Sequence, residues 1–496
     1  MDYILAIDIG TTNCKAVVFD AKGQVISALK NGYATFSDDD GKSEQKPDDV
    51  FNVVLELISE SFKKNQTISA VSFSAAMHSL IAIDKQGKPL TNAIMWADTR
   101  SRQQAESLKA TETGTIIYNK TGTPIHPMSP LCKIIWLREE MPDLFEMADK
   151  FVSIKEYIFY KLFNAYIIDY SIASATGLFD IKSLTWCEEA LQAAGIQPRH
   201  LSLPVDVIHI ETNLSSHYKY ITGTQQTISF VVGGNDGCLA NLGSGVISPG
   251  DASLTIGTSG AVRMTINKPK QDEAQRTFTY LLTKDIYITG GAINNGGVTL
   301  EWLSKTLMND ATPTHPDELL TIAETAPAGA DNLLFLPYLL GERAPMWDAA
   351  AKGVLFGISQ QHTKAHIARA AVEGICFALR DVMEAIEETN GVIKIIYASG
   401  GFTQSSFWLQ TMANILGKEI RVNKGADASA TGAAVIGMYA LKKINQLPDA
   451  MHFFSIQKTF YPDETVHEMY NSLFLIFQSL YQKLKGAFAA ISTLKK

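Results

Sequence analysis

Two glycine–hydroxyl turns are the residues in this chain whose types best suit chemistry on a phosphate. Ile9-Gly10-Thr11-Thr12 bends the run LAIDIGTTNCKAVVFD, and Ile256-Gly257-Thr258-Ser259 bends the run ASLTIGTSGAVRMTI. In each case β-rich apolar residues lead into the turn and out of it, which is typical of a hairpin. Glycine lets the backbone approach a ligand closely, and the hydroxyl and N–H groups of such a loop can bind phosphate oxygens.

The repetition of this turn carries more weight than either copy. A single hairpin of this kind is more often an ordinary tight turn, but the second copy follows the first after about half of the 496 residues. The repeat predicts two similar lobes that grip one nucleoside triphosphate. The expected nucleotide contacts are Gly10, Thr11, Thr12, Lys15, Gly257, Thr258, Ser259, Gly297, Gly400, Gly401 and Gln404.

Some of these residues have a competing structural interpretation. Lys15 is equally compatible with an exposed strand lysine. Gly400-Gly401 ends the run IKIIYASGG, where adenine could approach the backbone, although glycine is common at strand-to-helix turns. Asp8 stands just before the first bend, a position that suits a Mg²⁺ ligand acting through water, and its alternative role is to cap the turn.

Asp236 is the sharpest single candidate for a catalytic group. It lies in GGNDG at the end of the apolar run TISFVVGGNDG, and α/β folds place their active sites at the carboxyl ends of strands. A carboxylate there could accept a proton from a substrate hydroxyl. The alternative is an Asp that forms its own turn, as Asx-Gly pairs commonly do.

A second group of residues suits a polyol or a sugar acid. His78 ends the apolar run SAVSFSAAM, and Trp96, Asp98 and Arg100 follow shortly after. An indole ring offers an apolar face, and Asp and Arg offer polar edges, although each of these residues is singly more often a structural group. His362 and His366 are four apart, but without a third ligand they are expected to be surface or capping histidines.

The elements that must position these residues alternate between strands and helices. The chain begins as strand, bend, strand, turn and strand, and residues 47–64 are predicted to form an amphipathic helix. Residues 362–389 are predicted to form a long helix that Asn390-Gly391 ends. Residues 466–496 are predicted to form a C-terminal amphipathic helix. Strands followed by helices in both halves predict α/β lobes with mixed sheets.

Composition limits the partners of the chain. The net charge of −8 argues against nucleic acid or an anionic membrane as the main partner, although a local site can still bind a small anion. The five cysteines are scattered without C-x-x-C spacing, which predicts reduced thiols in a cytoplasmic protein. No signal peptide is expected, and no uncharged apolar run is long enough to span a membrane.

Taken together, these motifs resemble the FGGY family of carbohydrate kinases, within the actin-like and sugar-kinase ATPases. MSPLCKIIWL at residues 128–137 is similar to the first signature of the family, and GVLFGISQQHTKAHIARAAVE at residues 353–373 is similar to the second. GERAP at residues 341–345 also stands where the family has such a loop. With IDIGTT, TIGTSG and ASGGF in order, the resemblance covers essentially the whole chain.

The resemblance implies a fold and a division of labour. It implies two ribonuclease H-like lobes with mixed sheets, a sugar-binding domain at residues 1–245 and a nucleotide-binding domain at residues 246–496, with ATP in the cleft. It implies Asp236 as the catalytic base and Asp8 near Mg²⁺. Members are often dimers or tetramers, and a homodimer is the state expected first. By position in the family, the sugar pocket is expected to contain Met77, His78, Trp96, Met128 and Asp236.

Within the family, several stretches are most similar to gluconate kinases, and xylulose kinases are the nearest alternative. The stretches are SFSAAMHSLIAID, MWADTRS, TGTPIHPMSPL, SIKEYIF and IDYSIASATG. Glycerol and xylulose kinases have Gln or Asn directly after the base, whereas Gly237 follows it here, so one amide contact to the substrate is missing. A sugar acid needs a donor for its carboxylate, and His126 or Arg100 is expected to supply it.

The resemblance implies transfer of the γ-phosphate of ATP to D-gluconate, which gives 6-phospho-D-gluconate. Phosphorylation of xylulose or another sugar is the first alternative. An actin-like or chaperone-type ATPase with a protein partner is the second, but such proteins lack a segment like TGTPIHPMSPLCKIIW. A non-catalytic sugar sensor is disfavoured because Asp8 and Asp236 are both present.

Overall fold

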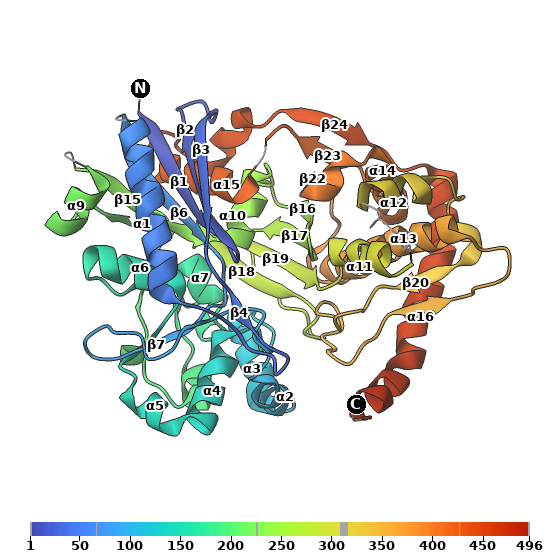
Figure 1. Ribbon diagram of the computed structural model, residues 1–496, viewed down its shortest axis with the longest axis horizontal. Helices are drawn as coiled ribbons and strands as arrows, with labels where there is room; N and C mark the ends of the chain where they lie inside the picture. The colour runs from blue at the N-terminus through green and yellow to red at the C-terminus, as the bar shows by residue number, and fades with distance from the viewer. Residues whose placement is uncertain (1, 66, 225–226, 308–315, 426, 495–496) are drawn as a thin grey trace.

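Two mixed β-sheets, one from each half of the chain, form the framework of the molecule (Figure 1). The computed structural model describes residues 2–65, 67–224, 227–307, 316–425 and 427–494. The first sheet has the strand order β14 (Ile210–Glu211), β15 (Ser229–Asn235), β6 (Ile68–Ala75), β1 (Tyr3–Ile9), β2 (Asn13–Phe19) and β3 (Val25–Gly32). The second has the order β18 (Phe278–Thr283), β19 (Ile286–Ile293), β17 (Gly260–Ile266), β16 (Asp251–Ile256), β22 (Ile395–Ser399), β23 (Ile420–Asn423) and β24 (Ile456–Phe460).

The two sheets repeat one topology. In the first, β1 and β2 pair antiparallel, as do β2 and β3, while β6 runs parallel to β1 and to β15. In the second, β16, β17 and β19 form the antiparallel series, and β22 runs parallel to β16 and to β23. The expected α/β fold of two similar lobes with mixed sheets is therefore confirmed. The division of the chain between residues 245 and 246 stays a prediction.

Helices cover both sheets and fill the space between them. They are α1 (Pro47–Lys64), α2 (Arg102–Lys109), α3 (Glu112–Thr121), α4 (Pro130–Glu140), α5 (Pro142–Met147), α6 (Ile154–Phe163), α7 (Tyr170–Ser174), α8 (Glu188–Ala194), α9 (Ser216–Thr222), α10 (Asp236–Gly243), α11 (Gly297–Leu307), α12 (Pro316–Glu324), α13 (Lys364–Asn390), α14 (Ser406–Leu416), α15 (Ala428–Ala440) and α16 (Glu464–Thr493).

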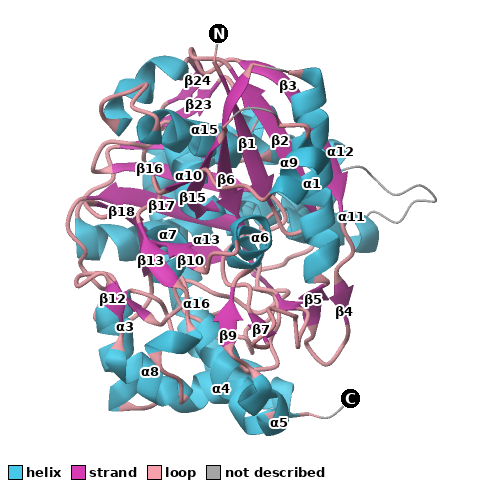
Figure 2. Ribbon diagram, turned by 90° about the vertical axis from the view of Figure 1, so that its left-hand side faces the viewer, coloured by secondary structure: helices cyan, strands magenta, loops and turns pink. Residues whose placement is uncertain are grey.

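Short strand pairs complete the fold, and helices α3, α4, α5 and α8 gather at the end of the molecule away from the chain's N-terminus (Figure 2). The short strands are β4 (Phe36–Ser37), β5 (Ser43–Gln45), β7 (Ile81–Ile83), β8 (Ala93–Ile94), β9 (Lys150–Val152), β10 (Ile167–Asp169), β11 (Phe179–Asp180), β12 (Thr185–Trp186), β13 (Leu203–Val205), β20 (Leu334–Leu336) and β21 (Val354–Phe356).

Strand β1 shows why the first sheet needs helices on both faces. Leu5 and Ile7 point into the same core as Val54 of α1, while Ile4 and Ala6 point into a second core shared with α10 and α15. Successive strand residues face opposite sides of a sheet, so an uninterrupted apolar run such as YILAIDI must be covered twice. This double burial fixes β1 at the centre of the lobe and brings Asp8 to its carboxyl end.

Helices α10 and α15 cross between the two sheets at very short range (Figure 1). They occupy equivalent places in the repeat, because α10 follows β15 and α15 follows β23. A Cβ on Gly432 would lie 2.0 Å from the Leu239 carbonyl oxygen, and one on Gly243 would lie 1.8 Å from the Ala428 carbonyl oxygen. Only glycine allows this approach, so the crossing holds the start of α10, where Asp236 lies, against the second half of the chain.

The predicted helices are confirmed with small shifts at their ends. The first is α1 as predicted, with Pro47 in its first turn, two acidic residues beside it and two lysines at its end, which suits the helix dipole. The long helix is α13 and the C-terminal one is α16; residues 495–496 lie outside the described residues. Helix α13 is buried around most of its circumference and not along one face, because β17, β19, α12 and α14 all pack on it.

All five cysteines are buried, and none of them forms a disulfide. Within the described ranges, no helix combines the length and the apolar character needed to cross a membrane.

Candidate active site

A cavity of about 240 Å³ opens where the two hairpin bends approach each other, and both halves of the chain line it. From the first half it is lined by Thr11, Ala76, Met77, His78, Trp96, Met128 and Asp236. From the second half it is lined by Ser259, Gly260, Ala261, Arg263, Phe278, Tyr280, Ala292, Arg343 and Trp347. Five of the residues expected for a sugar pocket therefore meet in one cavity, but the second lobe contributes to its wall as much as the first.

Asp236 is the first residue of α10, directly after β15. The Asn235 side chain caps the helix by accepting a hydrogen bond from the Cys238 N–H at 2.7 Å. The Asp236 side chain is therefore not the cap of this helix. The Asp236 carboxylate accepts the Gly237 N–H at 2.8 Å. Burial raises the pKa of Asp236, and the positive charge of Arg263 opposes that rise. A half-buried carboxylate of raised pKa that lines a cavity is suited to accept a proton there.

Asp8 is the last residue but one of β1. Its Oδ1 accepts the Ser74 hydroxyl at 2.7 Å. Burial, followed by the negative charges of Asp427 and Asp236, raises the pKa of Asp8 to about 7. A cation beside Asp8 would relieve this repulsion, so the site favours one. Within the described residues no group of three or more His, Cys, Asp or Glu side chains could hold a metal ion.

Lys15 joins the two halves of the chain. Its Nζ lies 2.6 Å from Asp427 Oδ2, and Asp427 is the N-cap of α15. The ion pair with Asp427 is the main reason why the pKa of Lys15 is raised, against the effect of burial. Lys15 is thus neither a free surface lysine nor unpaired, and its ammonium group lies close to Asp8.

The two hairpin bends are held in shape by their neighbours. Trp96 Nε1 donates to the Thr11 hydroxyl at 3.1 Å, and Tyr33 and Gln45 donate to the carbonyls of Gly10 and Thr11. In the second bend, the Gly297 N–H donates to the Gly257 carbonyl at 2.7 Å. The start of α11 therefore packs on the second hairpin. These contacts bring Gly297 and Gly257 together, as a shared nucleotide site requires.

Gly257 and Gly401 leave space that a ligand can use. A Cβ built on either residue would meet no atom within 4 Å. Gly400 is different, because the fold requires glycine at this position. Its φ is +100°, and a Cβ there would lie 2.3 Å from the Ile256 carbonyl oxygen. Gln404 ends the short 3₁₀ turn that follows and is exposed.

His78 and Trp347, which both line the cavity, have φ angles in the left-handed region, at 69° and 47°. Residues other than glycine rarely adopt this conformation, and such strain gathers at functional sites. His78 Nδ1 lies 2.8 Å from the Ala175 carbonyl oxygen, so Nδ1 carries the proton and Nε2 is left to accept. Burial lowers the pKa of His78 to about 3, so the ring is neutral.

His126 lies behind the cavity and does not line it. Its ring centre is 5.2 Å from that of Trp347, and its Nδ1 accepts the Met128 N–H at 3.2 Å. Burial, with the charge of Arg343, lowers the pKa of His126 to about 3. A neutral histidine one layer back can position Trp347, but it offers no positive charge to a carboxylate.

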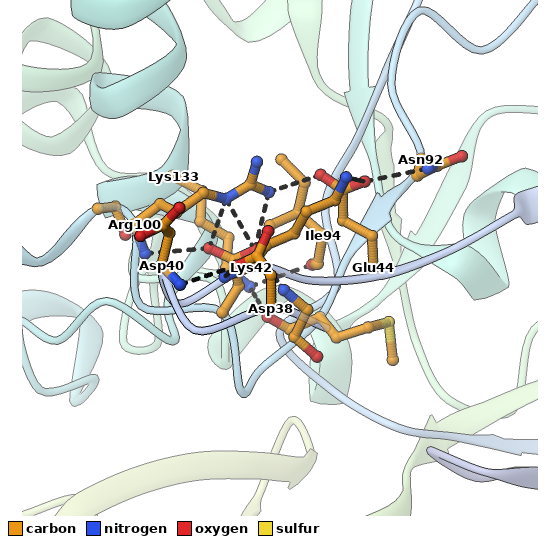
Figure 3. Close-up of polar contacts among 12 residues, drawn as sticks. Asp38, Asp40, Lys42, Glu44, Asn92, Ile94, Arg100 and Lys133 are labelled. Carbon is orange, nitrogen blue, oxygen red and sulfur yellow. Dashed lines mark hydrogen bonds and ion pairs between the residues drawn. The ribbon is translucent and has the colours of Figure 1, made fainter. Parts of the chain in front are cut away.

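Arg100 is not brought to the cavity at all. Its Nη2 lies 2.6 Å from Glu44 Oε1 and 2.8 Å from Asp98 Oδ2, and Figure 3 shows the guanidinium turned toward this polar cluster. The group also lies over the Trp136 ring at 4.5 Å. Two carboxylates already occupy its donors, so Arg100 is better described as a residue that ties Glu44 of β5 to the segment of Asp98.

Lys133 lies in the same polar region as Arg100 (Figure 3). The amine is buried and donates to three carbonyl oxygens, at 2.6 Å from His78, 2.8 Å from Met95 and 3.2 Å from Ile94. Burial lowers the pKa of Lys133 to about 7, but three carbonyls need three N–H donors, which only the ammonium form offers. Lys133 therefore ties the segment of His78 to that of Trp96.

Replacing Lys133 by Met is expected to lower the free energy of unfolding by about 1–3 kcal/mol, because buried carbonyls lose their donor. Urea unfolding followed by tryptophan fluorescence measures the change. Lys182→Met, at an exposed position, is the matched control and should leave the midpoint unaltered. Equal midpoints for the two variants would show that the three hydrogen bonds contribute nothing.

Sequence reasoning missed Arg263 and Arg343. The signal for Arg263 was available, because a charged residue interrupts the apolar run ASLTIGTSGAVRMTI in the middle of a buried strand. Arg343 lies in the GERAP loop, which stood out as a motif but not as part of a pocket. His362 and His366 are capping residues as expected: each accepts a backbone N–H three residues before it, and His366 also contacts Asp331.

Comparison with known proteins matches both halves of the chain to one family. Residues 3–243 match the N-terminal domain, and residues 252–441 the C-terminal domain, of the FGGY family of carbohydrate kinases. The gluconokinase of Bacillus licheniformis is 41% identical over 504 residues, which cover 100% of this chain and 98% of that protein.

Two solved structures superpose closely on the whole chain. The crystal structure of gluconate kinase from Lactobacillus acidophilus has a TM-score of 0.95 at 34% identity and covers 99% of both chains. That of ligand-bound xylulose kinase from Lactobacillus acidophilus has a TM-score of 0.96 at 34% identity and covers 99% of this chain and 100% of that one. The likeness therefore includes both sheets.

Proposed function

Because the chain belongs to the FGGY family of carbohydrate kinases, and so transfers phosphate from ATP to a carbohydrate, we propose that it phosphorylates D-gluconate to 6-phospho-D-gluconate. The observation that carries the proposal is the cavity that joins Asp236 to both hairpin bends. The gluconokinase of Bacillus licheniformis, 41% identical over the whole chain, supports gluconate as the substrate.

Asp236 is proposed as the catalytic base. The substrate lies in the cavity between Trp96, Met128 and Trp347, with its terminal hydroxyl at the Asp236 carboxylate. Asp236 takes the proton of that hydroxyl. At the same time the hydroxyl oxygen attacks the γ-phosphorus, and the bond between this phosphorus and the bridging oxygen of ADP breaks. Burial raises the pKa of Asp236, which strengthens it as a proton acceptor, and the positive charge of Arg263 opposes that rise.

The phosphate chain is proposed to lie between the two bends, against Thr11, Thr12, Thr258 and Ser259. Lys15, the cross-strand neighbour of Asp8, is positioned by its 2.6 Å contact with Asp427. Asp8 is proposed to hold Mg²⁺, with water and phosphate oxygens as the other ligands. When bound, the metal neutralises charge on the transferred phosphoryl group. The hydroxyl and N–H groups of the bends supply the remaining electrostatic stabilisation.

Adenine is proposed to pack against Gly400-Gly401 and Gln404. Gly401→Val is expected to raise the KM for ATP roughly tenfold, about 1.4 kcal/mol, because the new side chain fills a space that meets no protein atom within 4 Å. For the same reason the thermal midpoint should stay that of the wild type. Gly400→Val is the contrasting variant and should lose stability. An unchanged KM for ATP in Gly401→Val would remove this turn from the nucleotide site.

The proposed substrate is tested by steady-state kinetics with Mg-ATP and five acceptors: D-gluconate, D-xylulose, L-ribulose, glycerol and L-fuculose. Gluconate should have the highest kcat/KM. Xylulose is the second candidate, because the ligand-bound xylulose kinase from Lactobacillus acidophilus is as similar in structure as the gluconate kinase from the same organism. A preference for xylulose would keep Asp236 and reject gluconate. Because the chain belongs to a family of carbohydrate kinases, the alternative of an ATPase that acts on protein partners is rejected.

We also propose a cytoplasmic homodimer, on the strength of the family resemblance and of five reduced, buried cysteines. Sedimentation velocity distinguishes a dimer from the 54.3 kDa monomer. A single monomeric species at micromolar concentration would contradict the dimer.

A further inference from the structure

Arg263 is a charged residue in a place where the fold itself does not need one. It lies on β17, three residues beyond Gly260, and its side chain lines the cavity that contains Asp236. Its Nε is buried and has no hydrogen-bond partner. No ion pair joins its guanidinium to another residue in the described part of the chain, and its charge interacts with Asp236 only at longer range. Burying a guanidinium nitrogen without a hydrogen-bond partner is costly, and an anion bound in the cavity would offset that cost.

The Arg263 guanidinium and the Met77 side chain both lie close to the position that a side chain at residue 237 would take. A Cβ built on Gly237 would lie 2.8 Å from Met77 Cε, 3.1 Å from Arg263 Nε and 3.4 Å from Arg263 Nη2. Arg263 therefore lies directly against the residue that follows the catalytic base. Because Gly237 has no side chain, the Arg263 guanidinium can lie close to it.

A second guanidinium faces the same cavity. Arg343 Nη2 donates to the Ile293 carbonyl at 3.0 Å, and the group lies over the Trp96 ring at 5.2 Å. Its Nε, like that of Arg263, is buried without a partner. Burial lowers the pKa of both arginines, that of Arg343 to about 10.

The other titratable groups around the cavity do not balance these charges. His78 and His126 are neutral, with pKa values near 3 for the same reason of burial. Asp236 is one carboxylate for two cations. The Glu342 carboxylate interacts with the charge of Arg343, but its oxygens already accept hydrogen bonds from Asn294, Asn295 and the Arg343 backbone. The cavity is thus prepared for an organic anion that also carries hydroxyl groups.

We propose that Arg263, assisted by Arg343, binds the carboxylate of the sugar acid and so determines that this enzyme acts on an acid and not on a neutral polyol. The inference rests on the proposed function and deepens it. A guanidinium recognises a carboxylate through charge and paired N–H donors. The same chemistry would suit the γ-phosphate of ATP, and the experiment must separate the two anions.

The test compares D-gluconate with D-glucitol, which has a CH₂OH group where gluconate has its carboxylate. The readout is the ratio of kcat/KM for the two sugars, together with the KM for ATP. Any general effect of Arg263 on Asp236 acts on both sugars and cancels in the ratio. Arg263→Met, which fills similar space without charge, is expected to reduce the gluconate-to-glucitol ratio by about 10- to 100-fold, mainly by raising the KM for gluconate.

Two further variants keep the test decisive. Arg263→Lys keeps the charge but loses the paired donors, so it should recover part of the ratio. Arg263→Gln replaces the Met variant if thermal unfolding shows that Met disturbs the fold. Arg199→Met, at an exposed position, is the control and should match the wild-type ratio.

The outcomes are distinct. Equal losses of kcat/KM for gluconate and glucitol would show that Arg263 acts only through Asp236. A raised KM for ATP with an unaltered gluconate-to-glucitol ratio would show that Arg263 binds the phosphate. Either result would contradict the carboxylate subsite and leave the proposed function standing. A wild-type enzyme that prefers D-xylulose to D-gluconate would instead contradict the proposed function, and the subsite with it.

Discussion

Asp236→Asn is expected to lower kcat by about 10²- to 10⁴-fold, because general-base assistance contributes that much to a proton transfer. The amide has nearly the shape of the carboxylate and can still accept the Gly237 N–H, so the start of α10 should be undisturbed. ATP affinity should therefore stay within a small factor of the wild type. The loss should appear in kcat for every sugar, since the base acts on the hydroxyl and not on the rest of the substrate.

Stopped-time assays of ADP formation, with calorimetric titration of a non-hydrolysable ATP analogue, separate the two quantities. Asp39→Asn, in an exposed loop, controls for the loss of one negative charge. Near-normal turnover in Asp236→Asn would remove Asp236 from the mechanism, and loss of nucleotide binding would give it a structural role instead.

Gly432→Val is expected to have the second-largest effect, this time on the fold. Any Cβ at this position would lie 2.0 Å from the Leu239 carbonyl oxygen and 2.7 Å from the carbonyl carbon, so the backbone of α10 must move. Overpacking at a rigid backbone contact is expected to cost more than about 3 kcal/mol. Because α10 begins at Asp236 and α15 is capped by Asp427, activity should fall along with stability.

Thermal unfolding followed by circular dichroism measures this effect. Gly486→Ala is the matched control: it lies in α16, a Cβ there meets nothing within 4 Å, and alanine favours a helix, so its midpoint should equal or exceed that of the wild type. A Gly432→Val protein that unfolds at the wild-type temperature would show that α10 and α15 do not need their close crossing.

The features that sequence reasoning predicted correctly have local causes. The two hairpins, the helix at residues 47–64 and the strand before Asp236 follow from apolar spacing and from glycine at tight turns, all within short windows of sequence. The repeated hairpin then implied the repeated sheet topology. His78, Trp96, Met128 and Asp236 meet in the cavity because each follows such an element or lies in a motif that the family resemblance identified.

The features that it missed depend on contacts between distant parts of the chain. Arg100 has the right chemistry for a carboxylate, but Glu44, far away in sequence, already binds its guanidinium. His126 is set behind Trp347 by the fold of the second lobe. Arg263 reaches the cavity only because β17 packs close to α10, and no local pattern encodes that approach. Charge partners and cavity walls are set by tertiary packing.

One competition assay tests the central claim most directly. The purified enzyme is given Mg-ATP with equal concentrations of D-gluconate and D-xylulose, and the phosphorylated products are identified and quantified by mass spectrometry and ³¹P resonance. The account predicts that 6-phospho-D-gluconate is the dominant product and that Asp236→Asn forms almost none of it. A dominant xylulose phosphate, or ADP released without any phosphorylated sugar, would contradict it.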